Sequence, residues 1–409
     1  MGMGRDQQQT ARGTHLRYVH RVITLFIVAF TLYLGVTGTL IQLIDLRTLF
    51  SNAPAEDVEM ASIREGLNGP GPFQVIAYAD YTATALPADL NVQAALSKLL
   101  SSARTLDATA PLNYLEVRMA DGKPVGQAQL NEQVQRFDLE TGGHRGSVIV
   151  PVESQRPDSQ RNAVKSLHRM TTFGNWILWV NVLVGLSLGV MIVTGIVMYF
   201  QLLSARARSK RSGLFWKAGG WWRTLHRWIS VVAAVFLLVV ALSGTWLAVE
   251  SLGVGIYRAN HRNDPAVEPI SPLRDADVSS MANTTLTAYR SALPDTPIKV
   301  LRLRTYGGMP QGVVITGEAE ARQIVFNAVT GDRAGQTEPG YPVSGFPFGW
   351  QAHQIAKQVH RGDFIGLTGR WMDLFAGLSL IFLSISGAVM YFDMWQRRKG
   401  MGRNGLLWK

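Results

Sequence analysis

The sequence has no cysteine among its 409 residues. Disulfides, cysteine-ligated zinc, iron–sulfur clusters and covalently attached c-type haem are therefore excluded. Charged residues are also missing from four long runs, which contain no Asp, Glu, Lys or Arg: Val22–Ile44, Trp176–Leu203, Trp228–Val249 and Leu374–Phe392. A helix rises about 1.5 Å per residue, so each run is long enough to cross a hydrocarbon core of about 30 Å. The sequence thus predicts four transmembrane helices in a lipid membrane.

Basic residues gather beside these predicted helices. Four arginines precede the first helix, the segment "SARARSKRSG" (Ser204–Gly213) follows the second, and "RRK" (Arg397–Lys399) follows the fourth. All three groups fall on one side of a four-helix topology, and an excess of Lys and Arg marks the cytoplasmic side. We therefore expect a multi-pass protein of a bacterial inner membrane with both termini in the cytoplasm. Because the net charge of +11 is concentrated at helix ends, no nucleic-acid partner is expected.

The first half of the chain is repeated in the second half. "VHRVITLFIVAFTLYLGVTGTLI" begins at Val19, and "LHRWISVVAAVFLLVVALSGTWL" begins at Leu225. Both open with a His-Arg pair, and His20 and His226 each lie 18 residues before a glycine. A second pair of segments matches without a gap at an offset of 192, so that His168-Arg169 corresponds to His360-Arg361. The sequence therefore contains two copies of one larger unit.

The segments between the helices are also repeated. "RFDLETGGHRG" (Arg136–Gly146) parallels "VFNAVTGDRAG" (Val325–Gly335), and each follows alternating, strand-like runs and an earlier helical run. These patterns predict one helix packed on about three antiparallel strands in each copy. The predicted fold class is a membrane α-helical protein of four transmembrane helices, formed from a duplicated two-helix unit, with two periplasmic α+β domains.

The predicted organisation has nine parts. They are a cytoplasmic tail (1–14), a transmembrane helix (15–45), a periplasmic domain (46–165), a transmembrane helix (166–203), a basic cytoplasmic loop (204–221), a transmembrane helix (222–249), a second periplasmic domain (250–358), a transmembrane helix (359–393) and a cytoplasmic tail (394–409).

Four histidines occupy matched positions in this organisation. Both copies enter the membrane with the same orientation, so matched residues are expected at equal depth. His20 then faces His226 near the cytoplasmic surface, and His168 faces His360 near the outer surface. Two facing imidazoles suit axial ligation of a haem iron, and two such pairs would carry electrons across the bilayer. A His-Arg pair at a helix end is also typical of an interfacial anchor.

Other residues are candidates for the same sites. Arg17 and Arg223 lie three residues before their histidines and on the same helical face, where they either pair with haem propionates or are ordinary cytoplasmic charges. His353 lies seven residues before His360. It either replaces His360 as a ligand, contacts a substrate or lies at the surface.

Aromatic residues precede the last predicted helix, in the stretch "YPVSGFPFGWQAH" (Tyr341–His353). They form either an interfacial aromatic belt or a docking surface beside the outer haem. The substrate-contact candidates are Phe346, Phe348 and Trp350.

The duplicated His-Arg helices, their Thr-Gly and Ser-Gly dipeptides and the Thr-Gly-containing outer segments resemble the PepSY-associated transmembrane protein family. The resemblance covers about residues 15–395. Within that family the sequence is similar to the periplasmic ferric-siderophore reductases of the ferrioxamine type. The resemblance implies two PepSY-like domains and two b-type haems, whose irons are bound by His20, His226, His168 and His360. It also implies an oxidoreductase that delivers electrons to the ferric iron of a siderophore and releases Fe(II).

The leading hypothesis is therefore a di-haem inner-membrane reductase for iron uptake. Some relatives carry a fused flavin reductase domain, and this sequence ends at Lys409 without one. The electron donor is thus expected to be a separate cytoplasmic flavoprotein or a membrane quinol. The alternative is a non-redox siderophore transport or accessory protein, and protease inhibition is suggested by the family name alone. No motif in the outer segments identifies a particular siderophore.

Overall fold

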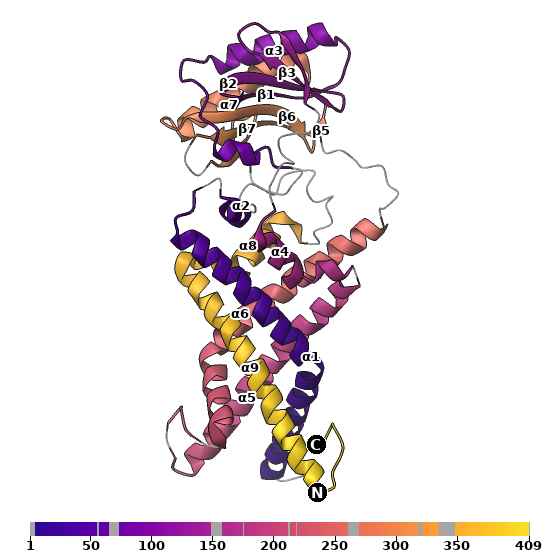
Figure 1. Ribbon diagram of the computed structural model, residues 1–409, viewed down its shortest axis with the longest axis vertical. Coiled ribbons are helices and arrows are strands. Elements are labelled where there is room, and N and C mark those ends of the chain that lie inside the picture. Colours follow the sequence, from indigo (N-terminus) through magenta and orange to yellow (C-terminus); the bar gives the residue numbers. More distant parts are fainter. Residues whose placement is uncertain are drawn as a thin grey trace. The chain divides into compact units, whose positions relative to one another are not determined.

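The computed structural model describes ten stretches of the chain and divides it into two compact units (Figure 1). The first contains residues 1–46, 161–256 and 352–409, and we call it the helical unit. The second contains residues 47–160 and 257–351, and we call it the sheet unit. The described residues are 5–54, 57–64, 73–148, 158–174, 176–211, 213–217, 219–260, 270–317, 321–334 and 348–408.

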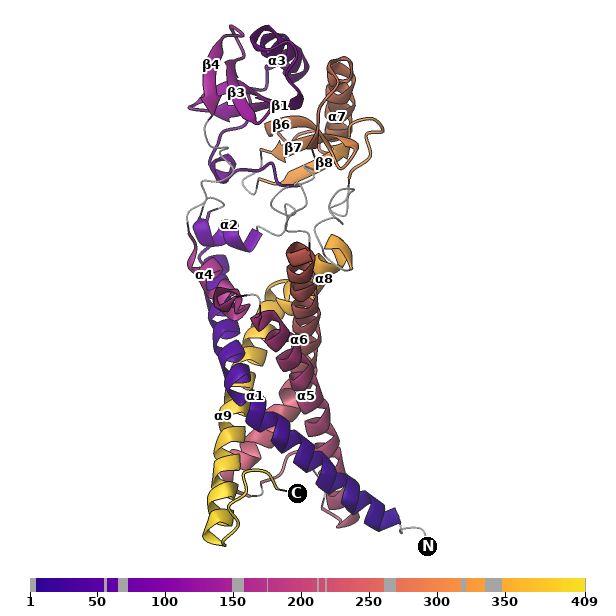
Figure 2. The same cartoon turned by 90° about the vertical axis from the view of Figure 1, so that its right-hand side faces the viewer.

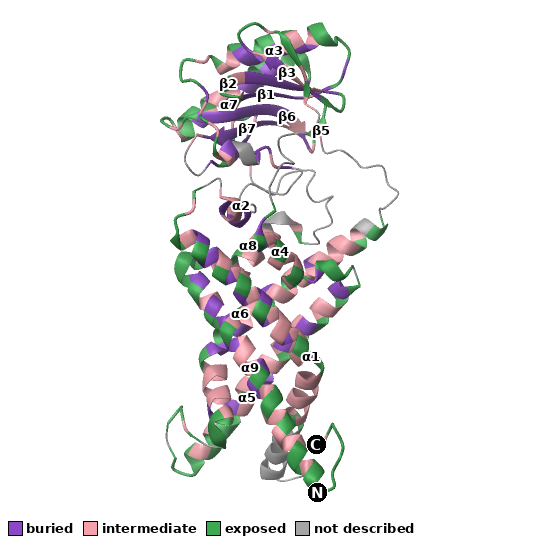
Figure 3. Cartoon of the chain, viewed as in Figure 1, coloured by how far each residue is buried: buried purple, intermediate pink, exposed green. Residues whose placement is uncertain are grey.

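Four long helices form the helical unit: α1 (Arg5–Phe50), α5 (Ile177–Arg208), α6 (Gly220–Asn260) and α9 (Gly366–Gly400). Each contains a segment long and apolar enough to cross a membrane, and only 17–28% of the most apolar part of each segment is buried within the chain. Large apolar side chains such as Phe26 and Val235 are accordingly exposed along these helices (Figure 3). Because such surface is stable only against lipid, the chain is a multi-pass membrane protein.

The long helices make two matched close contacts. A Cβ atom added to Gly185 would lie 2.4 Å from the hydroxyl oxygen of Thr245, and one added to Gly377 would lie 2.6 Å from that of Thr39. Glycine is therefore required at both positions for α5 to approach α6 and for α9 to approach α1. Small residues at helix crossings of this kind are typical of membrane bundles.

Two short helices, α4 (Gln160–His168) and α8 (Gly349–His360), precede the spanning helices α5 and α9. The sequence predicts continuous helices over 166–203 and 359–393, whereas the structure interrupts both after the histidine. Left-handed backbone conformations cause the breaks, at Met170 (φ 55°) in the first copy and Gly362 (φ 72°) in the second. A Cβ atom on Gly362 would also lie 2.2 Å from the carbonyl oxygen of Gly369. His168 and His360 are thus the last residues of short helices that do not themselves span the membrane.

The sheet unit contains a single antiparallel sheet in the order β4-β3-β2-β1-β6-β7-β8, with β5 beside β6. Helices α3 (Val92–Leu106) and α7 (Val278–Ala292) share one apolar core with the sheet (Figure 2). Three short helices, α2 (Val58–Arg64), η3 (Tyr78–Tyr81) and η6 (Asp275–Asp277), complete the described elements of this unit. The strands are β1 (Leu112–Ala120), β2 (Lys123–Leu130), β3 (Gln133–Asp138), β4 (His144–Val148), β5 (Ile270–Ser271), β6 (Ile298–Tyr306), β7 (Met309–Thr316) and β8 (Gln323–Asn327).

Each copy contributes one helix and its strands to this sheet. The sequence predicts a domain of one helix and about three strands in each outer segment, and both sets of elements are present. They share one sheet because β1 of the first copy pairs with β6 of the second, with Glu116 directly opposite Arg302. The two outer segments therefore form one compact unit.

A buried charge network lies at this junction of the two copies. Glu116 forms one ion pair with Arg302 at 2.6 Å and a second with Arg118 at 2.8 Å. Arg118 also contacts Asp80 at 2.9 Å, and all four side chains are at most 6% exposed. Burial raises the pKa of Asp80, although the Arg118 guanidinium beside it favours the charged form. Glu116 is thus the carboxylate on which both buried guanidinium groups converge.

We predict that Glu116→Gln destabilises the sheet unit by about 3 kcal/mol, because two buried arginines lose their shared counter-charge. Hydrogen–deuterium exchange of β1 and β6 in the full-length protein, followed by mass spectrometry under native conditions, measures the change. The control is Asp121→Asn, which removes the exposed partner of Arg136 and should cost less than about 1 kcal/mol. Equal stability of the two variants would contradict the role given to Glu116.

Candidate functional site

The four repeated histidines form two pairs in the helical unit. His20 on α1 and His226 on α6 line the same cavity, and we call them the inner pair. His168 at the end of α4 and His360 at the end of α8 form the outer pair, with ring centroids 6.3 Å apart and ring planes inclined by 34°. The two names follow the sides that the sequence predicts. The structure thus brings together the residues that the repeat predicts as partners.

Each histidine of the inner pair is held through Nδ1 by a hydroxyl group on another helix. His20 Nδ1 lies 3.0 Å from the Thr194 hydroxyl, and His226 Nδ1 lies 2.7 Å from the Ser386 hydroxyl. Thr194 already donates its hydroxyl hydrogen to the carbonyl of Val190 in its own helix. Its oxygen therefore accepts the hydrogen bond from the imidazole N–H.

The outer pair repeats this arrangement. His168 Nδ1 lies 2.9 Å from the Thr37 hydroxyl, and His360 Nδ1 lies 3.2 Å from the Ser243 hydroxyl. Both hydroxyl groups donate to carbonyl oxygens of their own helices four residues earlier. The Ser386 hydroxyl likewise donates to the carbonyl of Leu383 in its own helix at 3.2 Å. We therefore infer for all four rings that the proton is on Nδ1 and that Nε2 keeps its lone pair. A hydrogen bond of this kind orients a metal-ligating histidine and increases its basicity.

A glycine follows every one of these hydroxyl residues and gives the ring its space. A Cβ atom on Gly244 would lie 2.9 Å from Cε1 of His360, and one on Gly38 would lie 3.3 Å from Cε1 of His168. At Gly195 and Gly387 the corresponding contact is a wider 3.7 Å. We call each Thr-Gly or Ser-Gly dipeptide a hydroxyl–glycine seat. Each seat binds a histidine of its own copy, so the two pairs form between the copies.

The surroundings of the inner pair fit a large planar ligand. The cavity has a volume of about 1130 Å³, and its lining includes both histidines, Gly195 and Gly387. Cofactor and ligand pockets are typically about 300–1,000 Å³, so the cavity has room for a macrocycle. Arg17 and Arg223 also line it, and their pairing with acidic groups of a ligand stays one of the two alternatives that the sequence offers.

The spacing of the outer pair fits one metal ion between the rings. Two metal–imidazole bonds of about 2 Å, each extended by about 1.1 Å to the ring centre, give roughly the observed centroid separation of 6.3 Å. Burial lowers the pKa of His168 to about 3 and also lowers that of His360. Both rings are therefore neutral near pH 7, which is the form that binds a metal.

The donor set restricts what either pair could hold. Within the described residues, no three His, Cys, Asp or Glu side chains come together as a group that could bind a metal ion. Two neutral imidazoles leave the remaining coordination positions to a non-protein ligand, and a porphyrin provides equatorial nitrogens. Each pair thus offers two imidazoles, which would be the protein ligands of a haem iron if one were bound there.

The arginine directly after each inner histidine contacts a tryptophan ring, and sequence reasoning missed this contact. The Arg227 guanidinium lies 4.3 Å from the ring centre of Trp216, and that of Arg21 lies 4.7 Å from the ring centre of Trp408. Each indole is also stacked on a tyrosine, Tyr199 or Tyr391, at matched positions of α5 and α9. The sequence signal is "LFWK" at Leu214 and "LLWK" at Leu406, which share the offset of 192.

His353 does not lie free at the surface of the helical unit. The segment is helical, as one alternative requires, and Nδ1 of His353 lies 2.8 Å from Oε2 of Glu250, whose side chain is fully buried. His360, and not His353, is the ring that faces His168. Sequence reasoning missed Glu250, because nothing local pairs it with a residue 103 positions away.

The aromatic docking surface stays a prediction. Phe348 is 53% exposed. Trp350 belongs to α8, but its side chain is outside the described part of the chain, and so is the whole of Phe346.

These features define a multi-pass membrane protein with a duplicated, histidine-bearing helical unit. The chain belongs to the PepSY-associated TM region family, whose model matches residues 17–394. No curated protein matches the chain.

We predict that Thr37→Val releases the Nδ1 proton of His168, because valine keeps the shape of the side chain and removes the hydrogen-bond acceptor. The His168 ring should then populate both neutral tautomers, and the protein should lose about 1 kcal/mol of stability. Nitrogen-15 NMR of histidine-labelled protein without added ligand reports the tautomers. Thr39→Val, on the same helix but against Gly377, is the control and should leave the His168 signal unchanged. A single Nδ1–H tautomer in both variants would contradict the conclusion that the Thr37 hydroxyl fixes the tautomer of His168.

Proposed function

We propose that this protein is a di-haem reductase of a bacterial inner membrane. It passes electrons through the helical unit to the ferric iron of a siderophore in the periplasm and releases Fe(II). The observation that carries this proposal is the fourfold seat, in which Nδ1 of every paired histidine lies 2.7–3.2 Å from a hydroxyl oxygen. This contact favours a proton on Nδ1 and a lone pair on Nε2. Structural histidines have no need for one common tautomer at four matched positions, whereas axial ligands do.

The protein's own residues bind and orient the cofactor in this proposal. The seats hold the imidazole rings, and the absence of cysteine leaves only non-covalent, b-type attachment. Arg17 and Arg223 would pair with propionates in the inner cavity. A haem bound at each pair would supply one-electron redox chemistry at its iron.

The distance between the two pairs supports transfer across the membrane. Thr37, which holds His168, follows His20 by 17 residues on the continuous helix α1. Seventeen residues correspond to a rise of about 25 Å, compared with a hydrocarbon core of about 30 Å. The inner pair would therefore lie near one membrane surface and the outer pair near the other.

The basic segments beside the inner pair support its assignment to the cytoplasmic side. Electrons would enter there from a cytoplasmic flavoprotein or a membrane quinol. The sheet unit lies, in sequence, between α1 and α5 and again between α6 and α9, so it would be periplasmic. An Fe(III) siderophore would then receive the electron from the outer site, and the exposed Phe348 stays a candidate contact for it.

We predict about two non-covalent, low-spin haems per chain, which acid–acetone should extract. His20→Ala and His226→Ala should each remove the same haem, and His168→Ala and His360→Ala the other, because the pairs form between the copies. Redox titration of the Soret and α bands resolves which haem is lost in each variant. A folded protein with no Soret band after expression with ample haem would favour the transport or accessory alternative.

We also predict that right-side-out vesicles reduce an impermeant Fe(III) chelate, detected with a ferrous trap outside. His20→Ala should stop this reduction, because the inner site no longer accepts electrons. Its outer haem should still be reduced by dithionite added outside, which serves as the control for folding. Equal rates for the wild type and His20→Ala would show that the electrons take another route.

A further inference from the structure

The outer histidines need a support that the inner histidines do not. His20 and His226 lie on the continuous helices α1 and α6, so their backbones are fixed by the transmembrane packing. His168 and His360 end short helices that are followed at once by backbone breaks. Something must therefore set the position of α4 and α8, since a displaced axial ligand weakens or distorts a metal site.

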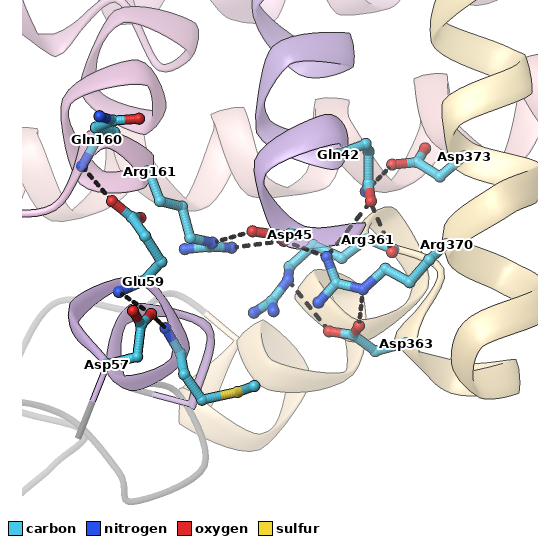
Figure 4. Close-up of polar contacts among 11 residues, drawn as sticks. Gln42, Asp45, Asp57, Glu59, Gln160, Arg161, Arg361, Asp363, Arg370 and Asp373 are labelled. Atoms are coloured by element: carbon cyan, nitrogen blue, oxygen red, sulfur yellow. Dashed lines mark hydrogen bonds and ion pairs between the residues drawn. The ribbon is translucent and has the colours of Figure 1, made fainter. Parts of the chain in front are cut away.

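An ion pair anchors α4 in the first copy. Arg161 lies seven residues, about two helical turns, before His168. Its Nε atom donates to Asp45 on α1 at 2.6 Å, and both side chains are at most 3% exposed (Figure 4). An ion pair this deeply buried is costly to break, because either charge alone would remain desolvated.

A second pair anchors α8 at the matched position. His353 corresponds to Arg161 at the offset of 192 and lies seven residues before His360. It contacts Glu250, which is on α6, the repeat partner of α1. Glu250 falls one position from the strict counterpart of Asp45, and its side chain is longer by one methylene. The two copies thus place different residues in the same role, a buried carboxylate that holds the helix carrying an outer histidine.

Asp45 also connects the first copy to the second. Arg370 on α9 forms an ion pair with Asp45 and another with Asp363, at 2.5 Å for the second (Figure 4). Asp363 in turn contacts Arg361, the residue directly after His360, at 3.1 Å. Asp45 is therefore linked directly to α4 and, through Arg370 and Asp363, to the break after α8.

We propose that Asp45–Arg161 and Glu250–His353 are two matched clasps that position the outer histidine pair from two helical turns away. Asp45 and Glu250 are positioning residues, which touch neither the cofactor nor the substrate. The cofactor-based readout of this proposal depends on the proposed function, while the clasps themselves are contacts of the protein.

The test uses the full-length protein with its haems and compares Asp45→Asn and Glu250→Met, which removes the acceptor of His353 Nδ1, with the wild type. We expect both variants to shift the midpoint potential and the EPR g-values of the outer haem and to raise its dissociation constant about tenfold. The inner haem should keep its wild-type values and serves as the internal control. Asp393→Asn, which removes an exposed partner of Arg397 on α9, is the matched control and should change neither haem.

Two double variants, which exchange the clasp residues between the copies, distinguish loss of positioning from loss of charge. Asp45→Glu with Arg161→His gives the first copy the residue types of the second, and Glu250→Asp with His353→Arg does the reverse. Both should retain the outer haem with nearly wild-type g-values, because a clasp is present in each. These variants also keep the test valid if Asp45→Asn fails to fold.

The outcomes distinguish the two proposals. Two haems with an unchanged outer haem in both Asp45→Asn and Glu250→Met would overturn the clasps and leave the proposed function standing. An equal shift of both haems would also overturn them, since it would indicate a general loss of packing. A wild-type protein without haem would contradict the proposed function. The nitrogen-15 signals of His168 and His360 would then decide, because loss of a clasp should loosen the Nδ1 hydrogen bonds of these rings alone.

Discussion

The hydrogen bond from an imidazole Nδ1 to a hydroxyl group is the contact on which the arrangement of the helical unit depends. The hydroxyl hydrogen is shared with a carbonyl of its own helix, so we infer that the oxygen accepts from Nδ1 and that the ring presents Nε2. The following residue must be glycine where the ring approaches most closely, as at Gly244. One side-chain contact thus defines the tautomer, the ring direction and the distance between two helices.

Because each seat binds a histidine of its own copy, a histidine pair requires both copies of the repeat. Each copy forms a closed set of helix contacts, and a histidine pair appears only where two copies meet. A site with two histidine ligands therefore needs both copies, because one copy provides a single ring at each depth. Duplication within one chain supplies the second ring without requiring a dimer. The same logic applies in the sheet unit, where β1 and β6 join the copies and Glu116 neutralises arginines from both.

The two copies differ most around the outer pair. The inner pair is flanked by matched clusters of arginine, tryptophan and tyrosine, and its symmetry is nearly complete. Near the outer pair, Asp45 and Arg161 of the first copy form an ion pair that Arg370 of the second copy joins, whereas the matched contact within the second copy is between His353 and Glu250. A symmetric backbone therefore carries an asymmetric electrostatic environment on the side where an acceptor would be reduced.

Local patterns in the sequence were sufficient for several features. Runs without charge predicted the four spanning helices, and the internal repeat predicted that His20 pairs with His226 and His168 with His360. Alternating runs predicted the strands of both copies. These features could be predicted because hydrophobic periodicity is a local property of the sequence, and a repeat is found by comparing the sequence with itself.

Only the tertiary structure decided the remaining features. The break after His168 depends on a left-handed backbone at Met170, and a methionine in the sequence does not predict that conformation. The single sheet depends on which of several exposed strand edges meet, and alternating patterns are silent on that choice. The partners of Asp45 and Glu250 lie more than 100 residues away, so these contacts exist only after the helices have packed. The sequence by itself thus determined which residues form the two pairs, and long-range packing decided how each ring is held.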